Sequence, residues 1–189
     1  MKTIRVFLAD DHAVVRTGLR RILEQNEDIE VVAESESGEQ ATDKFNEISP
    51  DVLVMDVSMP GIGGLEALRR ILTRHQSAKV ILYSMYESVT IATQAISSGA
   101  MAYIEKAADP KELIQAVRKA AVGKNYLSSL IAQKIAIQSV SGGDNPLQQL
   151  TAREFEVFRL LAEGKTVIEI AKILIIGRKT VANHQTLLK

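Results

Sequence analysis

Residues 52–61 read VLVMDVSMPG. An apolar run, Val52–Met55, leads to Asp56, and a Pro-Gly loop follows. Runs of this length that are rich in β-branched residues and bounded by turn signals are typical of strands. Four comparable runs occur within the first 122 residues, at Ile4–Ala9, Ile29–Ala33, Val80–Tyr83 and Ala102–Ile104. We therefore predict five strands in this part of the chain.

Amphipathic stretches separate and follow these runs, at Val14–Leu23, Glu39–Ile48, Leu65–Leu72, Val89–Ile96 and Lys111–Val122. In the first stretch the apolar residues recur at helical spacing, as a helix facing a core requires; they are Val15, Leu19, Ile22 and Leu23. Before the last stretch, Pro110 follows the potential cap Asp109 and suits a first helical turn. This alternation predicts an α/β fold, a doubly wound five-stranded parallel sheet with helices on both faces.

The composition excludes several classes of protein. Of the 189 residues, 46% are hydrophobic, which is normal for a globular chain, and runs such as Ile173–Ile176 are far too short to cross a membrane. There are no cysteines, which excludes disulfides, thiolate zinc sites and thiol catalysis. The N-terminus, Met1–Arg5, does not read as part of a signal peptide. We expect a cytoplasmic protein with no membrane partner.

Charge is unevenly distributed, although the net charge is zero. Residues 1–122 contain 14 Lys and Arg against 18 Asp and Glu, whereas residues 148–189 contain 7 against 4. An acidic first part and a basic last part fit a metal-using regulatory domain joined to a polyanion-binding domain. Chance explains this asymmetry about as well, so the charges alone do not decide the function.

Turn and linker signals separate the two parts of the chain. Gly123-Lys124-Asn125 ends the fifth helix, and residues 139–146 read as a flexible linker because they are rich in Ser and Gly. A connecting helix is expected between these signals, at Ser128–Ile137. We therefore predict a first domain over residues 1–122, a connecting helix and linker over residues 123–147, and a second domain over residues 148–189.

The last 42 residues read as a small all-α unit. Two Thr-x-x-Glu capping boxes, at residues 151–154 and 166–169, are typical of helix starts. Gly164 ends the first of these helices, and Gly177 breaks the chain before a last helix from Arg178 onward. Short helices joined by a tight turn that contains Gly are the pattern of a helix-turn-helix.

Polar residues that carry chemistry lie at the ends of the predicted strands. Asp10 and Asp11 follow the first strand, Asp56 ends the third, Ser84 the fourth and Lys106 the fifth. These ends share one edge of a parallel sheet, where ligands bind. Three carboxylates there would repel one another unless a divalent cation such as Mg²⁺ bound. Asp56 then suits a nucleophile towards a phosphoryl group, with Lys106 and Ser84 facing its oxygens. Each residue alone is more often a turn, cap or surface residue, so the prediction depends on their joint placement.

Residues 1–122 resemble a receiver domain, and the matching pieces are Leu8–His12, Val54–Gly61, Ser84 and Gly99–Lys106. The resemblance implies a Mg²⁺ site formed by Asp10, Asp11, Asp56 and the backbone carbonyl of Ser58. It also implies that a sensor histidine kinase phosphorylates Asp56, with Lys106 and Ser84 assisting and Tyr103 as the switch aromatic.

The resemblance suggests a hypothesis for the switch. Phosphorylation of Asp56 adds roughly −1.5 to −2 charges and three acceptor oxygens. Ser84 donates to these oxygens and draws its loop inward, and Tyr103 fills the space that is vacated. The result is a population shift between two packings.

Residues 148–189 resemble the helix-turn-helix domain of the NarL/FixJ (LuxR-type) response regulators. The matching pieces are Leu150–Glu154, Leu161–Gly164, Glu169–Ala171, Leu174, Ile176, Thr180-Val181 and His184. The resemblance implies that the last helix enters the major groove of double-stranded promoter DNA, with Val181 and Leu188 facing the core. The residues expected to face DNA are Arg178, Lys179, Thr180, Asn183, His184 and Thr186. A phosphorylation-linked homodimer is also implied, and Met59–Glu66 further resembles the GacA/UvrY branch.

The second domain departs from its family in several places. Family members usually carry a polar cap where Gly177 stands, a basic residue at Ala182 and Asn at Leu187. The chain ends at Lys189, before the family's fourth helix, so we expect this domain to lack its last helix. The alternative function is therefore a receiver with a degenerate or truncated output domain that acts through protein–protein interaction. A haloacid dehalogenase-type phosphatase would need a second Asp where Ser58 stands, so we do not expect an enzyme.

Overall fold

The computed structural model of the protein describes residues 3–141 and 152–187. The chain divides into two compact units, Met1–Gly143 and Asp144–Lys189, and each is described by itself. The first unit contains β1 (Ile4–Ala9), α1 (Ala13–Glu24), β2 (Ile29–Ser35), α2 (Gly38–Ile48), β3 (Val52–Asp56), α3 (Gly63–Arg74), β4 (Val80–Ser84), α4 (Val89–Ser97), β5 (Ala102–Glu105), α5 (Pro110–Ala121), β6 (Tyr126–Leu127) and α6 (Ser129–Ser141).

The strands of the first unit form one parallel sheet in the order β2-β1-β3-β4-β5-β6. This order confirms the doubly wound α/β fold. The predicted number of five strands was one too low, because β6 pairs with β5 at the edge, with Tyr126 opposite Ala102 and Leu127 opposite Tyr103. A strand of two residues is too short to show a pattern of alternating apolar and polar residues. Only its pairing with β5 in the folded protein identifies it as a strand.

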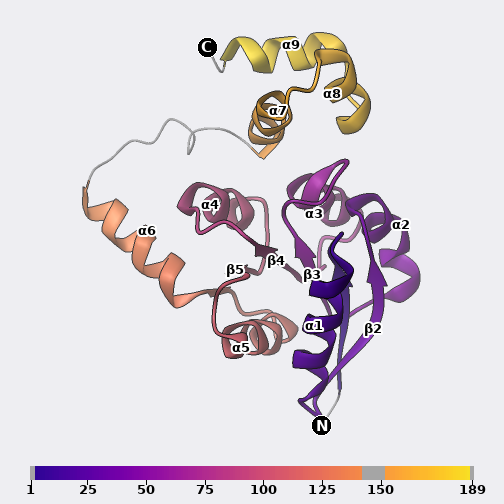
Figure 1. Ribbon diagram of the computed structural model, residues 1–189, viewed down its shortest axis with the longest axis vertical. Coiled ribbons are helices and arrows are strands. Elements are labelled where there is room, and N and C mark those ends of the chain that lie inside the picture. Colours follow the sequence, from indigo (N-terminus) through magenta and orange to yellow (C-terminus); the bar gives the residue numbers. More distant parts are fainter. Residues whose placement is uncertain (1–2, 142–151, 188–189) are drawn as a thin grey trace. The chain divides into compact units, whose positions relative to one another are not determined.

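Helices cover both faces of the sheet (Figure 1), and the core lies between these layers. Leu19 and Leu23 of α1, together with Leu113 and Val117 of α5, pack on one face against apolar strand residues such as Val6, Leu8, Val54, Ile81 and Ile104. Helices α2, α3 and α4 lie over the other face. Every residue of β3 is buried, as a central strand covered on both faces requires.

Side chains at the helix starts satisfy backbone donors that have no partner within the helix. Ser37 accepts from the amide of Gln40 at the start of α2, and Ser88 accepts from the amide of Ile91 at the start of α4. The predicted start of α5 is confirmed, with Asp109 as the cap and Pro110 in the first turn.

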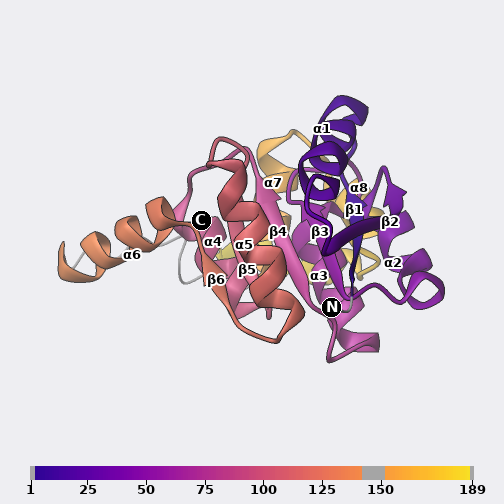
Figure 2. The same ribbon diagram turned by 90° about the horizontal axis from the view of Figure 1, so that it is seen from below.

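Helix α6 follows β6 and belongs to the first unit. It runs outward from the β6 edge of the sheet (Figure 2) and contacts α4. The predicted linker over residues 139–146 was partly wrong, because residues 139–141 continue this helix; the remaining linker residues lie outside the described part of the chain.

The second unit is a bundle of three helices, α7 (Ala152–Ala162), α8 (Val167–Leu174) and α9 (Arg178–Leu187). Its core consists of Val157, Leu160, Ile170, Ala171, Leu174 and Val181. The capping box of Thr166 and Glu169 is confirmed, whereas the box at residues 151–154 begins outside the described residues. Helix α8 is followed by its C-cap residue, Ile175, which has a left-handed φ of 54°, and Gly177 directly precedes α9. No helix among the described residues is long and apolar enough to cross a membrane.

Candidate functional site

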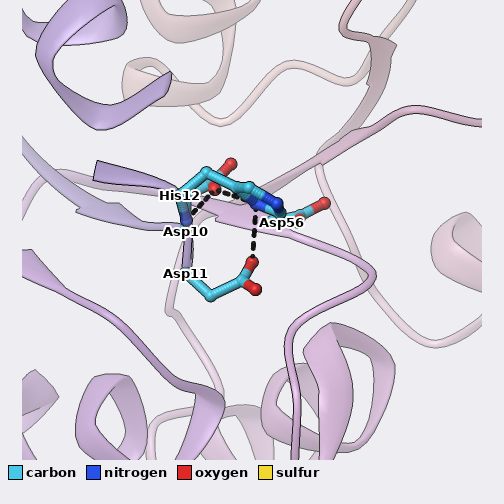
Figure 3. A group of neighbouring side chains, drawn as sticks. All are labelled: Asp10, Asp11, His12 and Asp56. Carbon is cyan, nitrogen blue, oxygen red and sulfur yellow. Dashed lines mark hydrogen bonds and ion pairs between the residues drawn. The ribbon is translucent and has the colours of Figure 1, made fainter. Parts of the chain in front are cut away.

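The strand ends bring the predicted acidic and basic residues together. Asp10 follows β1, Asp56 ends β3, Ser84 ends β4 and Lys106 follows β5. Because β1 pairs with both β2 and β3, the order of the strands reverses there, and such a switch point opens a crevice at the carboxyl edge of the sheet. Figure 3 shows Asp10, Asp11 and Asp56 close together at this edge.

Lys106 is the cation of this cluster. Its Nζ lies 2.5 Å from Oδ2 of Asp10 and 3.2 Å from Oδ2 of Asp56. The side chains of all three residues are at most 7% exposed, so water screens these ion pairs little. One ammonium group faces two buried carboxylates and Asp11 beside them, which leaves a net negative charge at the edge of the sheet.

Asp56 has the environment of a reactive carboxylate. Burial raises its pKa above the ordinary value, and the negative charge of Asp10 raises it further, whereas Lys106 and the backbone amide of Ser58 act in the opposite direction. Asp56 Oδ1 is buried and has no hydrogen-bond partner among the described residues. A buried carboxylate oxygen without a donor is costly, so this atom requires a proton, a cation or an incoming electrophile.

The ligand atoms of Asp10, Asp11, His12 and Asp56 all lie within 4.8 Å of one another. Carboxylate oxygens at this separation are the donor set that hard divalent cations prefer, and the uncompensated charge favours binding. The site therefore fits Mg²⁺. Ser58 lies two residues after Asp56 and is partly buried; its carbonyl stays a predicted ligand.

Ser84 and Tyr103 contact the same loop from two sides. Ser84 Oγ accepts a hydrogen bond of 3.1 Å from the amide of Tyr86, and the hydroxyl of Tyr103 donates one of 2.6 Å to the Tyr86 carbonyl. Tyr103 is fully buried, and this burial raises its pKa to about 12. The structure therefore holds Tyr103 buried against this loop, and the Tyr86 backbone connects it to Ser84.

The same loop also contacts α6. Lys134 Nζ lies 2.8 Å from Oε2 of Glu87 and 3.3 Å from the Glu87 carbonyl. No sequence pattern indicated this pair, because the two residues lie 47 positions apart in different elements. The pair connects the loop beside Ser84 with the helix that leads out of the first unit.

Arg16 is a second residue that sequence reasoning missed. Its Nη1 donates a 2.6 Å hydrogen bond to the Asp10 carbonyl, and its other nitrogens reach Glu34 at 3.2 Å and Glu36 at 2.9 Å. An arginine on an amphipathic helix normally faces water, yet Arg16 is only 7% exposed. It holds the turn that presents Asp10 and Asp11, and this role was not visible from periodicity.

Helix α9 carries the residues predicted to face DNA. Arg178, Lys179, Thr180 and Asn183 are exposed, whereas Val181 is fully buried in the core of the second unit, as expected. His184 is partly buried, and its Nδ1 lies 3.6 Å from Oε1 of Glu154 on α7. The side chain of Thr186 and all of Leu188 lie outside the described part of the chain. The exposed side of α9 thus offers two cations, a hydroxyl and an amide.

Both parts of the chain match known families. Residues 6–118 match the response regulator receiver domain, and residues 148–189 match the luxR family of bacterial regulatory proteins. The response regulator GacA of Pseudomonas protegens is 37% identical over 183 residues, covering 96% of this chain and 86% of that protein. The response regulator UvrY of Escherichia coli is 36% identical over 184 residues, covering 96% and 84%.

Solved structures show the same architecture. RcsB from Salmonella enterica, bound to a promoter in the presence of the phosphomimetic BeF₃⁻, has a TM-score of 0.79 and 28% identity, and covers 98% of this chain and 90% of that one. A LuxR-family two-component response regulator from Aurantimonas has a TM-score of 0.72 and 38% identity, and covers 74% of this chain and 99% of that one.

Proposed function

Because this chain belongs to the response regulators that join a receiver domain to a LuxR-type DNA-binding domain, we propose that Asp56 accepts a phosphoryl group from a sensor histidine kinase and so controls binding to promoter DNA. The observation that supports this proposal best is the buried Asp56 carboxylate, with one unpartnered oxygen and Lys106 3.2 Å from the other. We assign the receiver to residues 1–122, the connecting helix and linker to residues 123–147, and the output domain to residues 148–189.

The chemistry needs only the groups at the carboxyl edge of the sheet. A carboxylate oxygen of Asp56 attacks the phosphorus of the phosphohistidine, so a P–O bond forms while the P–N bond breaks, and the released imidazole takes up a proton. Lys106 favours the ionised form of Asp56 against the effect of burial and offsets negative charge on the phosphoryl oxygens. The hydroxyl of Ser84 supplies a further donor to these oxygens.

Asp10, Asp11, Asp56 and the backbone carbonyl of Ser58 would hold a Mg²⁺ ion at this site. When bound, it offsets the charge of the carboxylates and of the incoming phosphoryl group. Arg16 keeps the turn that carries Asp10 in place for this task through its 2.6 Å hydrogen bond to the carbonyl of Asp10.

Phosphorylation changes the loop after β4. A phosphoryl oxygen on Asp56 accepts a hydrogen bond from the Ser84 hydroxyl, which draws Ser84 inward together with the Tyr86 amide that donates to its oxygen. The loop moves towards the phosphoryl group, Tyr103, whose hydroxyl donates to the Tyr86 carbonyl, fills the space that is vacated, and Glu87 transmits the movement to Lys134 of α6. Shifting the population from 1:99 to 99:1 requires about 5.5 kcal/mol, which several charge-assisted hydrogen bonds supply.

The output of the protein is binding to double-stranded DNA, as a phosphorylation-linked homodimer. Helix α9 enters the major groove, where Asn183 reads a base edge and Arg178 and Lys179 neutralise phosphates. Because each lost phosphate contact lowers the salt dependence of binding, neutral replacement of Lys179 reduces the slope of log K against log salt by about 0.9.

A second candidate function is output through protein–protein interaction. The observation that favours it is the exposure of aliphatic side chains on the second unit, with Ile168 47% and Ile175 75% exposed. In that case the receiver chemistry stays the same, and only the partner of the second unit differs.

The test of the receiver chemistry is phosphorylation by an acyl phosphate in the presence of Mg²⁺, followed by intact-mass spectrometry of wild type, Asp56→Asn and Lys106→Met. We expect wild type to gain one phosphoryl group, Asp56→Asn to gain none, and Lys106→Met to react more slowly. Phosphorylation of Asp56→Asn to the level of wild type would contradict the assignment of Asp56.

A further inference from the structure

His12 stands beside the acidic pocket and is absent from the Mg²⁺ ligand set described above. Its Nδ1 lies 3.0 Å from Oδ1 of Asp11 and 3.3 Å from Oδ1 of Asp10. Figure 3 shows dashed lines from His12 to these two aspartates. The ring nitrogen therefore belongs to the same cluster of donor atoms as the three carboxylates.

These separations match the coordination shell of a small divalent ion. Two donors bound at about 2.1 Å lie about 3.0 Å apart across an octahedral edge and about 3.4 Å apart across a tetrahedral edge. The His12 nitrogen lies at 3.0 and 3.3 Å from its two carboxylate neighbours, within this range. The unpartnered and buried Oδ1 of Asp56 supplies an additional donor in the pocket.

The side chain of His12 plays no part in starting helix α1. His12 occupies the N-cap position of α1 with extended φ and ψ, and its side chain makes no capping hydrogen bond. Asp10 Oδ1 accepts a 2.8 Å hydrogen bond from the His12 amide, which fixes the backbone at this position. The imidazole is 66% exposed, so it turns towards an ion in the pocket at little cost.

An imidazole changes which ions a carboxylate pocket prefers. Mg²⁺ binds oxygen donors almost alone, whereas imidazole nitrogen suits Zn²⁺, Ni²⁺ and Cu²⁺, whose affinities for mixed N/O sites are higher. We propose that His12 is a nitrogen ligand for first-row transition metal ions in this pocket, together with Asp10, Asp11 and Asp56. His12 thereby raises the affinity for Zn²⁺ and Ni²⁺ without contributing to the binding of Mg²⁺.

The inference shares its pocket with the proposed function, but its test does not depend on phosphoryl transfer. Isothermal titration of the full chain with Ni²⁺ and separately with Mg²⁺ compares wild type with His12→Ala. The matched control is His75→Ala, because His75 is one of only three histidines and packs against Phe45 in a tilted arrangement, with ring centroids 5.1 Å apart, away from the pocket. Retained Mg²⁺ binding shows that His12→Ala is folded at this site.

We expect His12→Ala to bind Ni²⁺ at least about tenfold more weakly than wild type, with Mg²⁺ affinity within about twofold and His75→Ala unchanged. Unaltered Ni²⁺ affinity in His12→Ala would overturn the inference. Ni²⁺ and Mg²⁺ affinities that fall by the same factor would also overturn it, because His12 would then position the carboxylates. If Asp56 fails to accept a phosphoryl group while the Ni²⁺ result holds, only the proposed function is contradicted.

Discussion

Replacing Lys106 with Met keeps most of the side chain and removes the only Lys or Arg nitrogen shown within 4 Å of the carboxylate oxygens of Asp10 and Asp56 among the described residues. At an effective dielectric constant of about 20, ion pairs of these lengths contribute roughly 5–7 kcal/mol each, and the burial of each ion costs several kcal/mol. The net contribution of the intact cluster to the free energy of unfolding is therefore small. Removing only the cation leaves two buried carboxylates uncompensated, so we expect the free energy of unfolding to fall by about 3–5 kcal/mol at pH 8.

The pH dependence of this loss follows from Asp56. Its pKa in the folded protein is raised, so the folded state holds a proton that the unfolded state has released between the ordinary pKa and the raised one. Asp56 therefore contributes most to stability below its unfolded pKa, and this contribution declines as the pH rises through the folded pKa. Lys106→Met removes the positive charge that lowers the pKa of Asp56. The folded pKa then rises further, so the decline in stability extends to higher pH. The difference from wild type should be largest above the raised pKa and shrink towards pH 4.

Tyrosine fluorescence during urea unfolding measures this effect in the first unit alone. The four tyrosines lie between residues 83 and 126, and the chain has no tryptophan. The control is Lys111→Met, at an exposed lysine in the first turn of α5. Equal stability of Lys106→Met and wild type at pH 8, or a loss that grows as the pH falls, would refute the reasoning about the buried cluster.

Three substitutions test other parts of the account. A Cβ at Gly64 would lie 2.2 Å from the carbonyl oxygen of Asp56, so we expect Gly64→Ala to destabilise the first unit by about 1–3 kcal/mol and to weaken Mg²⁺ binding, measured by urea unfolding and titration. Gly18 lies inside α1 with no atom within 4 Å of the corresponding position, so Gly18→Ala should stabilise the same unit by about 0.5–1 kcal/mol, and a loss would contradict its placement. Ile175 ends α8 with a left-handed φ of 54°, so Ile175→Asn should slow amide hydrogen exchange in α8 by a stabilisation of about 1 kcal/mol; faster exchange would count against it.

Local pattern was sufficient to predict most of the first unit and the main residues of its site. Short apolar runs define strands, and because parallel strands end at one edge, Asp10, Asp56 and Lys106 were expected to meet there. The structure brings them within ion-pair distance. This inference needed only the alternation of strands and helices along the chain. In any parallel sheet the carboxyl ends of all strands lie at the same edge, whatever the order of the strands.

Contacts between distant elements could not be predicted in this way. The burial of Arg16 depends on Glu34, Glu36 and the Asp10 carbonyl, none of which follows from its place on an amphipathic helix. The pair of Glu87 and Lys134 likewise depends on where α6 packs. For β6, hydrogen bonds to β5 define the strand, and no sequence signal of its own does.

The central claim is that Asp56 controls DNA binding, and fluorescence anisotropy of labelled duplex DNA at low salt tests it most directly. Wild type and Asp56→Asn are titrated with and without Mg²⁺ and beryllofluoride, which mimics the phosphoryl group. We predict that beryllofluoride strengthens binding of wild type and has no effect on Asp56→Asn. Equal strengthening in both proteins would contradict the claim, and an absence of binding in every condition would favour the second candidate, output through a protein partner.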